Sequence, residues 1–240
     1  TLPHEHAVLH FESPTIERSE VLRYMGYHGQ KYSDEISQDL ETQMQAARDI
    51  SKPAAVADIF DVDTITEDPN PQVTLKDTSL VLKGKGIVKH LKDAKQVGVF
   101  AATLGMTDER ELRRLALTNK LGQIFFDAAS TALIERVCDE VEAHYVSYGA
   151  EHRLYTNWRF SPGYGDLPLA TQPTLLAALN AQSRIGISLS PSLLMTPTKS
   201  VTAIIGFFTE PQRSSHLTCA GCVCRDFCSL RERGVTCYGR

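Results

Sequence analysis

Apolar residues at helical spacing predict two helices near the start of the chain. Residues 17–25 form one short apolar face, and Gly26 is suited to end that helix. A second helix is expected to begin after Ser33, whose hydroxyl can cap free backbone amides. Its apolar positions are Ile36, Leu40, Met44 and Ala47.

Shorter apolar runs follow in the middle of the chain. Irregular alternation over 56–83 predicts short strands or loops, and 87–91 has the pattern of a short helix. The compact apolar run 97–102 is typical of a buried strand, which residues 103–105 would leave in a turn. Thr107 is then placed to cap another helix.

A long helix is predicted over 120–146, and an acidic residue lies on its apolar face. That face contains Leu121, Ile124, Phe125, Ala128 and Ala132. Glu135 falls on the same face, so it either forms a salt bridge at the edge of the core or faces a cationic ligand such as a sulfonium. Cys138, on this helix, is expected to be a buried, inert thiol.

The C-terminal half mixes turns, one short helix and strands. Turn-forming residues are frequent over 153–170, and 173–182 is an apolar helix. Strands are expected over 185–189 and over 200–208, which is rich in β-branched and aromatic residues. Because no βα unit repeats, we predict one α+β domain with an antiparallel or mixed sheet and flanking helices.

Residues 159–165 are the most informative candidate binding segment. Arg159 offers a fork of donors suited to a carboxylate. Ser161, Gly163 and Gly165 allow the backbone to approach a ligand closely. The loop is therefore a candidate to grip an amino acid and an attached ring. The alternative is an ordinary turn beside a surface arginine.

Cysteine is concentrated at the C-terminal end, where five of six cysteines occupy the last 22 residues. The candidate metal ligands are Cys219, Cys222, Cys224 and Cys228. They suit zinc or an iron–sulfur cluster, but their spacing is not a standard ferredoxin run. We therefore expect a domain over 1–210 followed by a Cys-rich tail over 211–240 that contains a metal site.

Composition narrows the class of protein further. The 240 residues are 42% hydrophobic, which suits a globular domain. A net charge of −4 without long single-sign runs argues against a general nucleic-acid binder. No stretch approaches the ~20 apolar residues that cross a bilayer. The first residues lack the regions of a signal peptide, so we expect a cytoplasmic protein, although a start at Thr1 leaves room for an upstream segment.

Six segments form an ordered set: residues 20–27, 84–91, 101–105, 159–166, 185–187 and 197–206. In this order they resemble blocks of the stand-alone cobalamin-dependent methionine synthase activation proteins. The resemblance spans about residues 17–231, and six blocks in the right order are more specific than any one. It implies a curved α+β domain with a central antiparallel sheet and a shallow groove for S-adenosylmethionine.

The resemblance also implies roles for individual residues. Residues 159–165 match a loop that reads Arg-Pro-Ala-Pro-Gly-Tyr-Pro in the fused synthases. By that match, Arg159 holds the methionine carboxylate of S-adenosylmethionine. Ser161, Gly163 and Tyr164 contact the ligand or shape its pocket. Glu135 is a looser match to an acidic residue on the family's long helix.

The chain departs from the fused synthases at two places. They have an aromatic residue near the position of Ile205, and that contact is missing here. The cysteine tail is absent from the fused domains but resembles the Cys-rich ends of stand-alone members.

The function implied by the resemblance is reductive methylation within cobalamin-dependent methionine synthase, a methyltransferase. An electron from a flavodoxin or ferredoxin and a methyl group from S-adenosylmethionine would reactivate cobalamin on a partner synthase core. The cobalamin is expected on the partner because no Asp-x-His-x-x-Gly motif is found here. Two alternatives stay open: a non-catalytic S-adenosylmethionine-binding assembly factor for a corrinoid protein, and a metal or redox protein built around the cysteines.

Overall fold

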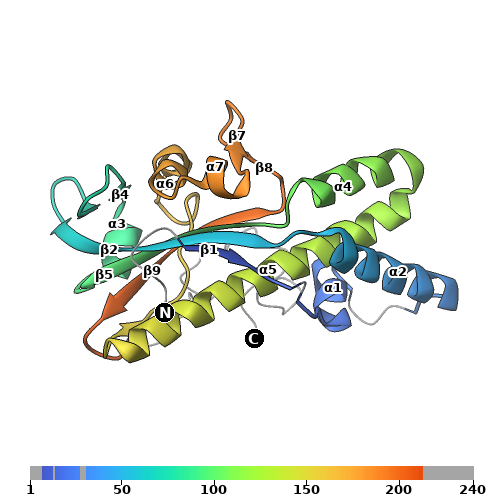
Figure 1. Ribbon diagram of the computed structural model, residues 1–240, viewed down its shortest axis with the longest axis horizontal. Coiled ribbons are helices and arrows are strands. Elements are labelled where there is room, and N and C mark those ends of the chain that lie inside the picture. Colours follow the sequence, from blue (N-terminus) through green and yellow to red (C-terminus); the bar gives the residue numbers. More distant parts are fainter. Residues whose placement is uncertain (1–6, 13, 28–30, 213–240) are drawn as a thin grey trace.

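The computed structural model describes residues 7–12, 14–27 and 31–212, and its centre is an antiparallel sheet (Figure 1). The strand order is β4-β3-β2-β5-β9-β6, and β1 also pairs with β2. The strands of this sheet are β1 (Ala7–His10), β2 (Ala54–Thr66), β3 (Gln72–Leu75), β4 (Val81–Lys83), β5 (Gln96–Thr103), β6 (Tyr155–Thr156) and β9 (Ser200–Phe208). A separate hairpin joins β7 (Ser188–Leu189) to β8 (Met195–Thr196). The predicted α+β class is confirmed, with every pairing of described strands antiparallel.

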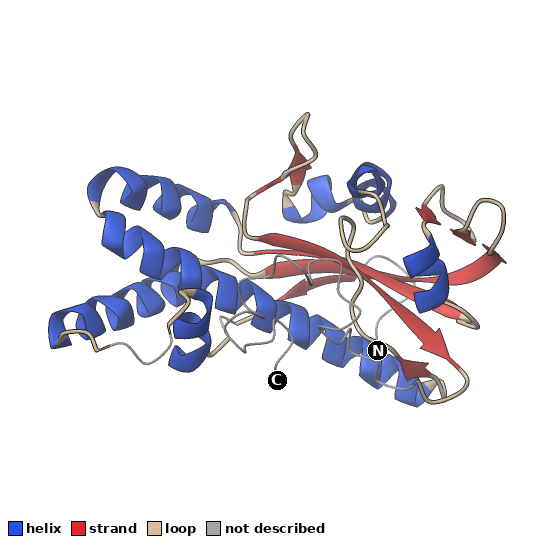
Figure 2. Ribbon diagram, turned by 180° about the vertical axis from the view of Figure 1, so that it is seen from behind, coloured by secondary structure: helices blue, strands red, loops and turns tan. Residues whose placement is uncertain are grey.

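Helices cover both faces of the sheet (Figures 1 and 2). They are α1 (Arg18–Tyr24), α2 (Asp34–Ile50), α3 (Lys85–His90), α4 (Met106–Thr118), α5 (Lys120–Glu151), α6 (Gln172–Ala178) and α7 (Ala181–Ile185), with a 3-10 turn at η1 (Leu169–Thr171). The long helix α5 crosses one face, and α1, α2 and α4 contact it. The other face packs against α3, α6 and α7. No helix of the described residues combines the length and apolarity needed to cross a bilayer.

The sheet separates two hydrophobic cores because successive strand residues point to opposite faces. On β5, Phe100 and Ala102 pack toward α5, whereas Val97, Val99 and Ala101 belong to the opposite core. Both faces of this strand are therefore buried, which explains why its sequence is a continuous apolar run.

Tyr145 connects α5 to the centre of the sheet. Its hydroxyl donates to the carbonyl oxygens of Val99 at 2.8 Å and Asp58 at 3.1 Å. A Cβ at Gly98 would lie 2.9 Å from the Tyr145 ring, so glycine allows the helix to approach β5 closely. These contacts fix α5 against the sheet and thereby place its acidic side chains.

The predicted helix starts agree with the structure at one cap and differ at another. Ser33 accepts a backbone hydrogen bond in the first turn of α2, as expected. The prediction that Thr107 caps the next helix is wrong, because α4 begins at Met106 directly after Gly105. The Thr107 hydroxyl instead donates to the carbonyl oxygen of Ile50 at 2.6 Å.

Two other expectations are corrected by tertiary packing. The strand predicted over 185–189 is shorter, since Ile185 ends α7 and Gly186 adopts a φ of 73°. On α5, Leu121 and Ile124 are 44% and 56% exposed, so part of the predicted apolar face is not buried among the described residues.

Candidate functional site

Arg159 and Glu135, singled out separately in the sequence, form an ion pair. Nη2 of Arg159 lies 3.3 Å from Oε2 of Glu135 on α5. The next residue, Phe160, exchanges backbone hydrogen bonds with Ile204 of β9. Neighbouring residues of an extended segment point to opposite sides. Arg159 accordingly faces α5, whereas Phe160 packs in the core on the other side of the sheet.

Two further carboxylates of α5 contact the same guanidinium. Nη2 of Arg159 lies 3.0 Å from Oδ1 of Asp139, and its Nε lies 3.2 Å from Oε2 of Glu142. Glu135, Asp139 and Glu142 follow each other at spacings of four and three residues, so they share one helix face. Neither Asp139 nor Glu142 was predicted as a site residue from the sequence. Their helical spacing from Glu135 was the signal that could have found them.

The ion-pair cluster is partly buried, and the Arg159 guanidinium at its centre keeps its positive charge. The Arg159 side chain is 20% exposed. Burial alone would lower the pKa of Arg159, but Cys138 and the three surrounding carboxylates raise it overall. Burial also raises the pKa of the Cys138 thiol, which confirms the expected buried, inert cysteine. Arg159 is thus a permanently charged group whose side chain is oriented by three carboxylates of α5.

A hollow of about 380 Å³ opens beside Glu135, between α5 and the start of α1. Its lining residues are Thr15, Ile16, Glu17, Glu20, Ala132, Glu135 and Arg136. The volume falls within the roughly 300–1,000 Å³ of small-molecule sites. Three lining side chains are acidic and one is basic, so the hollow favours a ligand with positive charge. Nearby on α1, burial and the charge of Glu135 raise the pKa of Tyr24.

The predicted loop after Arg159 is present as a compact turn. The Tyr164 amide donates to the Ser161 carbonyl at 3.0 Å, and the Gly163 amide donates to the Leu167 carbonyl at 2.9 Å. Gly163 and Gly165 have φ values of 88° and 54°, a backbone region that favours glycine. Tyr164 is 53% exposed. Contact of Ser161, Gly163 and Tyr164 with a ligand stays a prediction.

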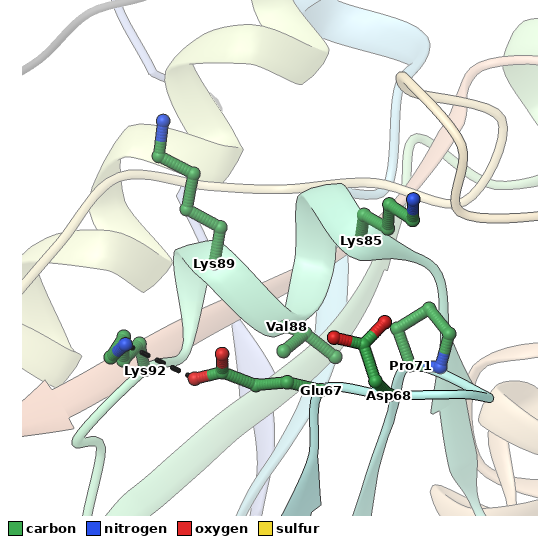
Figure 3. A pocket seen from close by; sticks show the side chains of 7 residues that line it. All are labelled: Glu67, Asp68, Pro71, Lys85, Val88, Lys89 and Lys92. Atoms are coloured by element: carbon green, nitrogen blue, oxygen red, sulfur yellow. Dashed lines mark ion pairs between the residues drawn. The ribbon is translucent and has the colours of Figure 1, made fainter.

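A second hollow, of about 280 Å³, lies between α3 and the turn joining β2 to β3 (Figure 3). It is lined by Glu67, Asp68, Pro71, Lys85, Val88, Lys89 and Lys92. Lys92 pairs with Glu67 at 3.1 Å, but both side chains are mostly exposed, so the pair contributes little stability. Because lysines and carboxylates are mixed here, this hollow does not select strongly for either charge.

The predicted metal ligands Cys219, Cys222, Cys224 and Cys228 lie outside the described residues. Within 7–12, 14–27 and 31–212, no group of three or more His, Cys, Asp or Glu side chains is arranged to hold a metal ion. The proposed metal site of the tail therefore stays a prediction from sequence.

Comparison with protein families decides where the chain belongs. The family described as vitamin B12 dependent methionine synthase, activation domain, matches residues 86–226, which is more than half of the chain. The chain belongs to this family. The resemblance inferred from sequence is thus confirmed, and the matched region of this activation domain includes Glu135 and the loop that begins at Arg159.

A solved structure supports the same fold for the activation domain. The crystal structure of the MetH reactivation domain bound to AdoHcy aligns with a TM-score of 0.64 and 14% sequence identity. The alignment covers 97% of this chain and 87% of that chain, so it extends to α1 and α2 before the family match begins. At this identity the likeness concerns the fold. Comparison with curated proteins finds no match.

Proposed function

We propose that this activation domain binds S-adenosylmethionine at Arg159 and Glu135, where the loop that follows Arg159 leaves the edge of the sheet beside α5, and supports reductive methylation of cobalamin on a partner methionine synthase core. The observation that supports this most is the Arg159–Glu135 pair beside the acidic hollow, in a member of the activation-domain family. The related MetH reactivation domain was crystallised with AdoHcy. That compound is what remains of S-adenosylmethionine once its methyl group has left.

The acidic side chains of the hollow, together with Arg159 beside it, suit the charges of S-adenosylmethionine, which has a carboxylate, an ammonium and a sulfonium. Arg159 has the forked geometry that matches a carboxylate. Glu135, Glu17 and Glu20 can offset the two cationic groups of the ligand. The acids of α5 also hold the Arg159 side chain in place before a ligand arrives, which reduces the entropy lost on binding.

The contribution of this chain is positioning. S-adenosylmethionine supplies the methyl group, which, with one electron from a flavodoxin or ferredoxin, would return the partner's cobalt to its methylated form and leave S-adenosylhomocysteine. Arg159 and Glu135 orient the amino-acid end and the sulfonium. Ser161, Gly163 and Tyr164 shape the pocket around the rest of the ligand. No protein nucleophile is required, because the methyl acceptor arrives on the partner.

Calorimetry of the full chain with S-adenosylmethionine, alone and with a cobalamin-loaded synthase core, tests the proposal. We expect saturable binding and, with a reductant present, transfer of the ligand's methyl group to the core. Binding without methyl transfer would instead support the non-catalytic assembly factor. Absence of binding in both arrangements would overturn the proposal, and a coloured redox-active tail in such a protein would favour the metal or redox class.

A further inference from the structure

Residues 161–165, the candidate ligand loop, are followed directly by Asp166. The carboxylate of Asp166 binds the first backbone amides of α3. The Lys85 amide donates to its Oδ2 at 2.6 Å, and the Gly86 amide donates to its Oδ1 at 2.8 Å. Hydrogen bonds from free helix-start amides to a carboxylate are charge-assisted and strong. Because Gly86 and Asp166 are 80 positions apart, the contact joins two distant segments of the chain.

Glycine at the start of α3 makes room for this carboxylate. A Cβ on Gly86 would lie 2.7 Å from Oδ1 of Asp166, and one on Gly84 would lie 2.8 Å from the Asp166 carbonyl oxygen. Alanine would be the better helix former at Gly86. The glycine there is therefore explained by the position of Asp166 rather than by the helix itself.

The ligand loop is consequently fastened at both ends. At one end, Phe160 exchanges backbone hydrogen bonds with Ile204 of β9 at 2.8 and 2.9 Å. At the other end, Asp166 is bound to α3, whose side chains Ile87 and Val88 are buried in the core. The residues between these two anchors are the ones predicted to contact S-adenosylmethionine: Ser161, Gly163 and Tyr164.

We propose that Asp166 is a positioning residue for this loop. By binding the first amides of α3, it holds residues 161–165 in the shape that accepts the ligand, and it raises affinity without touching the ligand. This inference rests on the proposed function. Coupling between two sites is reciprocal, so ligand binding must in turn strengthen the contact between Asp166 and α3.

Two variants disrupt the contact between Asp166 and α3 in different ways. Asp166→Ala deletes the carboxylate, whereas Gly86→Ala keeps it but places a Cβ 2.7 Å from Oδ1, so the carboxylate must shift. We expect both to lower S-adenosylmethionine affinity about fivefold or more, the lower end of typical coupling between sites. Asp166→Asn retains one acceptor oxygen and should recover part of the loss. The matched control is Ser33→Ala, which removes a helix cap from α2 and should leave affinity unchanged.

Amide hydrogen exchange supplies a readout that a purely structural cap would not change. In the parent protein, saturating S-adenosylmethionine should slow exchange at the Lys85 and Gly86 amides. In Asp166→Ala these amides should exchange faster and should no longer respond to the ligand. The parent measurement needs no variant, so it decides the question even if Asp166→Ala does not fold.

The outcomes separate this inference from the proposed function. A parent protein that binds no S-adenosylmethionine would overturn both. The inference alone is overturned if the parent binds while Asp166→Ala and Gly86→Ala bind as tightly as Ser33→Ala. Unchanged exchange at Lys85 and Gly86 on ligand binding in the parent would also overturn it.

Discussion

Nη2 of Arg159 lies 3.3 Å from Oε2 of Glu135, although the two residues are 24 positions apart. One side chain comes from the segment beside β9 and the other from α5. Asp139 and Glu142 contact the same guanidinium, so it is oriented by the folded chain. Glu135 therefore forms a salt bridge at the edge of the core and also lines an open hollow.

Arg159→Ala is expected to weaken S-adenosylmethionine binding. A hydrogen bond to a charged group is worth about 1.5–3 kcal/mol, so affinity should fall roughly tenfold or more. Arg159→Lys keeps the charge but not the fork, and it should recover only part of the affinity. Calorimetry checks both variants, with Arg114→Ala on α4 as a control that removes an arginine from an exposed ion pair. Parent-like affinity in a folded Arg159→Ala protein would remove this residue from the site.

Glu135→Gln should reduce the preference for S-adenosylmethionine over S-adenosylhomocysteine. The substitution keeps the shape of the side chain but removes the charge that offsets the sulfonium, which the thioether lacks. Two unit charges about 4 Å apart in fully hydrated surroundings interact by about 1 kcal/mol, which corresponds to roughly fivefold in affinity and is a lower limit for a partly buried site. Competition calorimetry with the two ligands measures the ratio, and Glu151→Gln near the end of α5 is the control. An unchanged ratio would exclude the sulfonium role.

His90 should make unfolding free energy depend on pH. Its ring packs between Trp158 and Phe160, at centroid distances of 4.9 and 5.0 Å. Burial lowers the pKa of His90 from its ordinary value of 6.5 to about 4. Because the folded pKa is the lower one, the stabilisation is complete above about pH 6.5 and is lost as pH falls toward 4.

Denaturant unfolding at two pH values measures this dependence. Between pH 7.5 and pH 5 the free energy of unfolding should fall by about 2 kcal/mol through His90 alone. Other groups titrate over the same range, so the comparison is with His90→Leu, which lacks the ring. An identical pH dependence in the parent and in His90→Leu would show that the ring is not held neutral.

The tail is expected to bind a metal independently of S-adenosylmethionine. The four thiols Cys219, Cys222, Cys224 and Cys228 lie within ten residues, and a metal would hold them as thiolates and fold the segment. Protein purified without oxygen should contain zinc or iron near one site per chain. The double variant Cys222→Ser, Cys228→Ser should lose the metal and keep S-adenosylmethionine binding. Metal-free parent protein with freely titratable tail thiols would contradict this prediction.

The sequence by itself determined the family and most local elements. The cap at Ser33, the strand over 200–208 and the long helix containing Glu135 depend on residues close together in the chain, so their patterns are readable. Six ordered blocks were enough to identify the activation-domain family. The same local reasoning failed at Thr107, because α4 already begins at Met106 and the Thr107 hydroxyl donates to the Ile50 carbonyl of a segment distant in sequence.

Only the tertiary structure decided how the site is assembled. Backbone pairing of Phe160 with Ile204 turns Arg159 toward α5, where acids more than 16 residues away in sequence surround it. The contact of Asp166 with the Gly86 amide likewise joins segments 80 positions apart. Such contacts depend on which strands pair and how the long helix crosses the sheet. Hydrophobic periodicity specifies which face of an element is buried, but not which distant polar side chain it will meet.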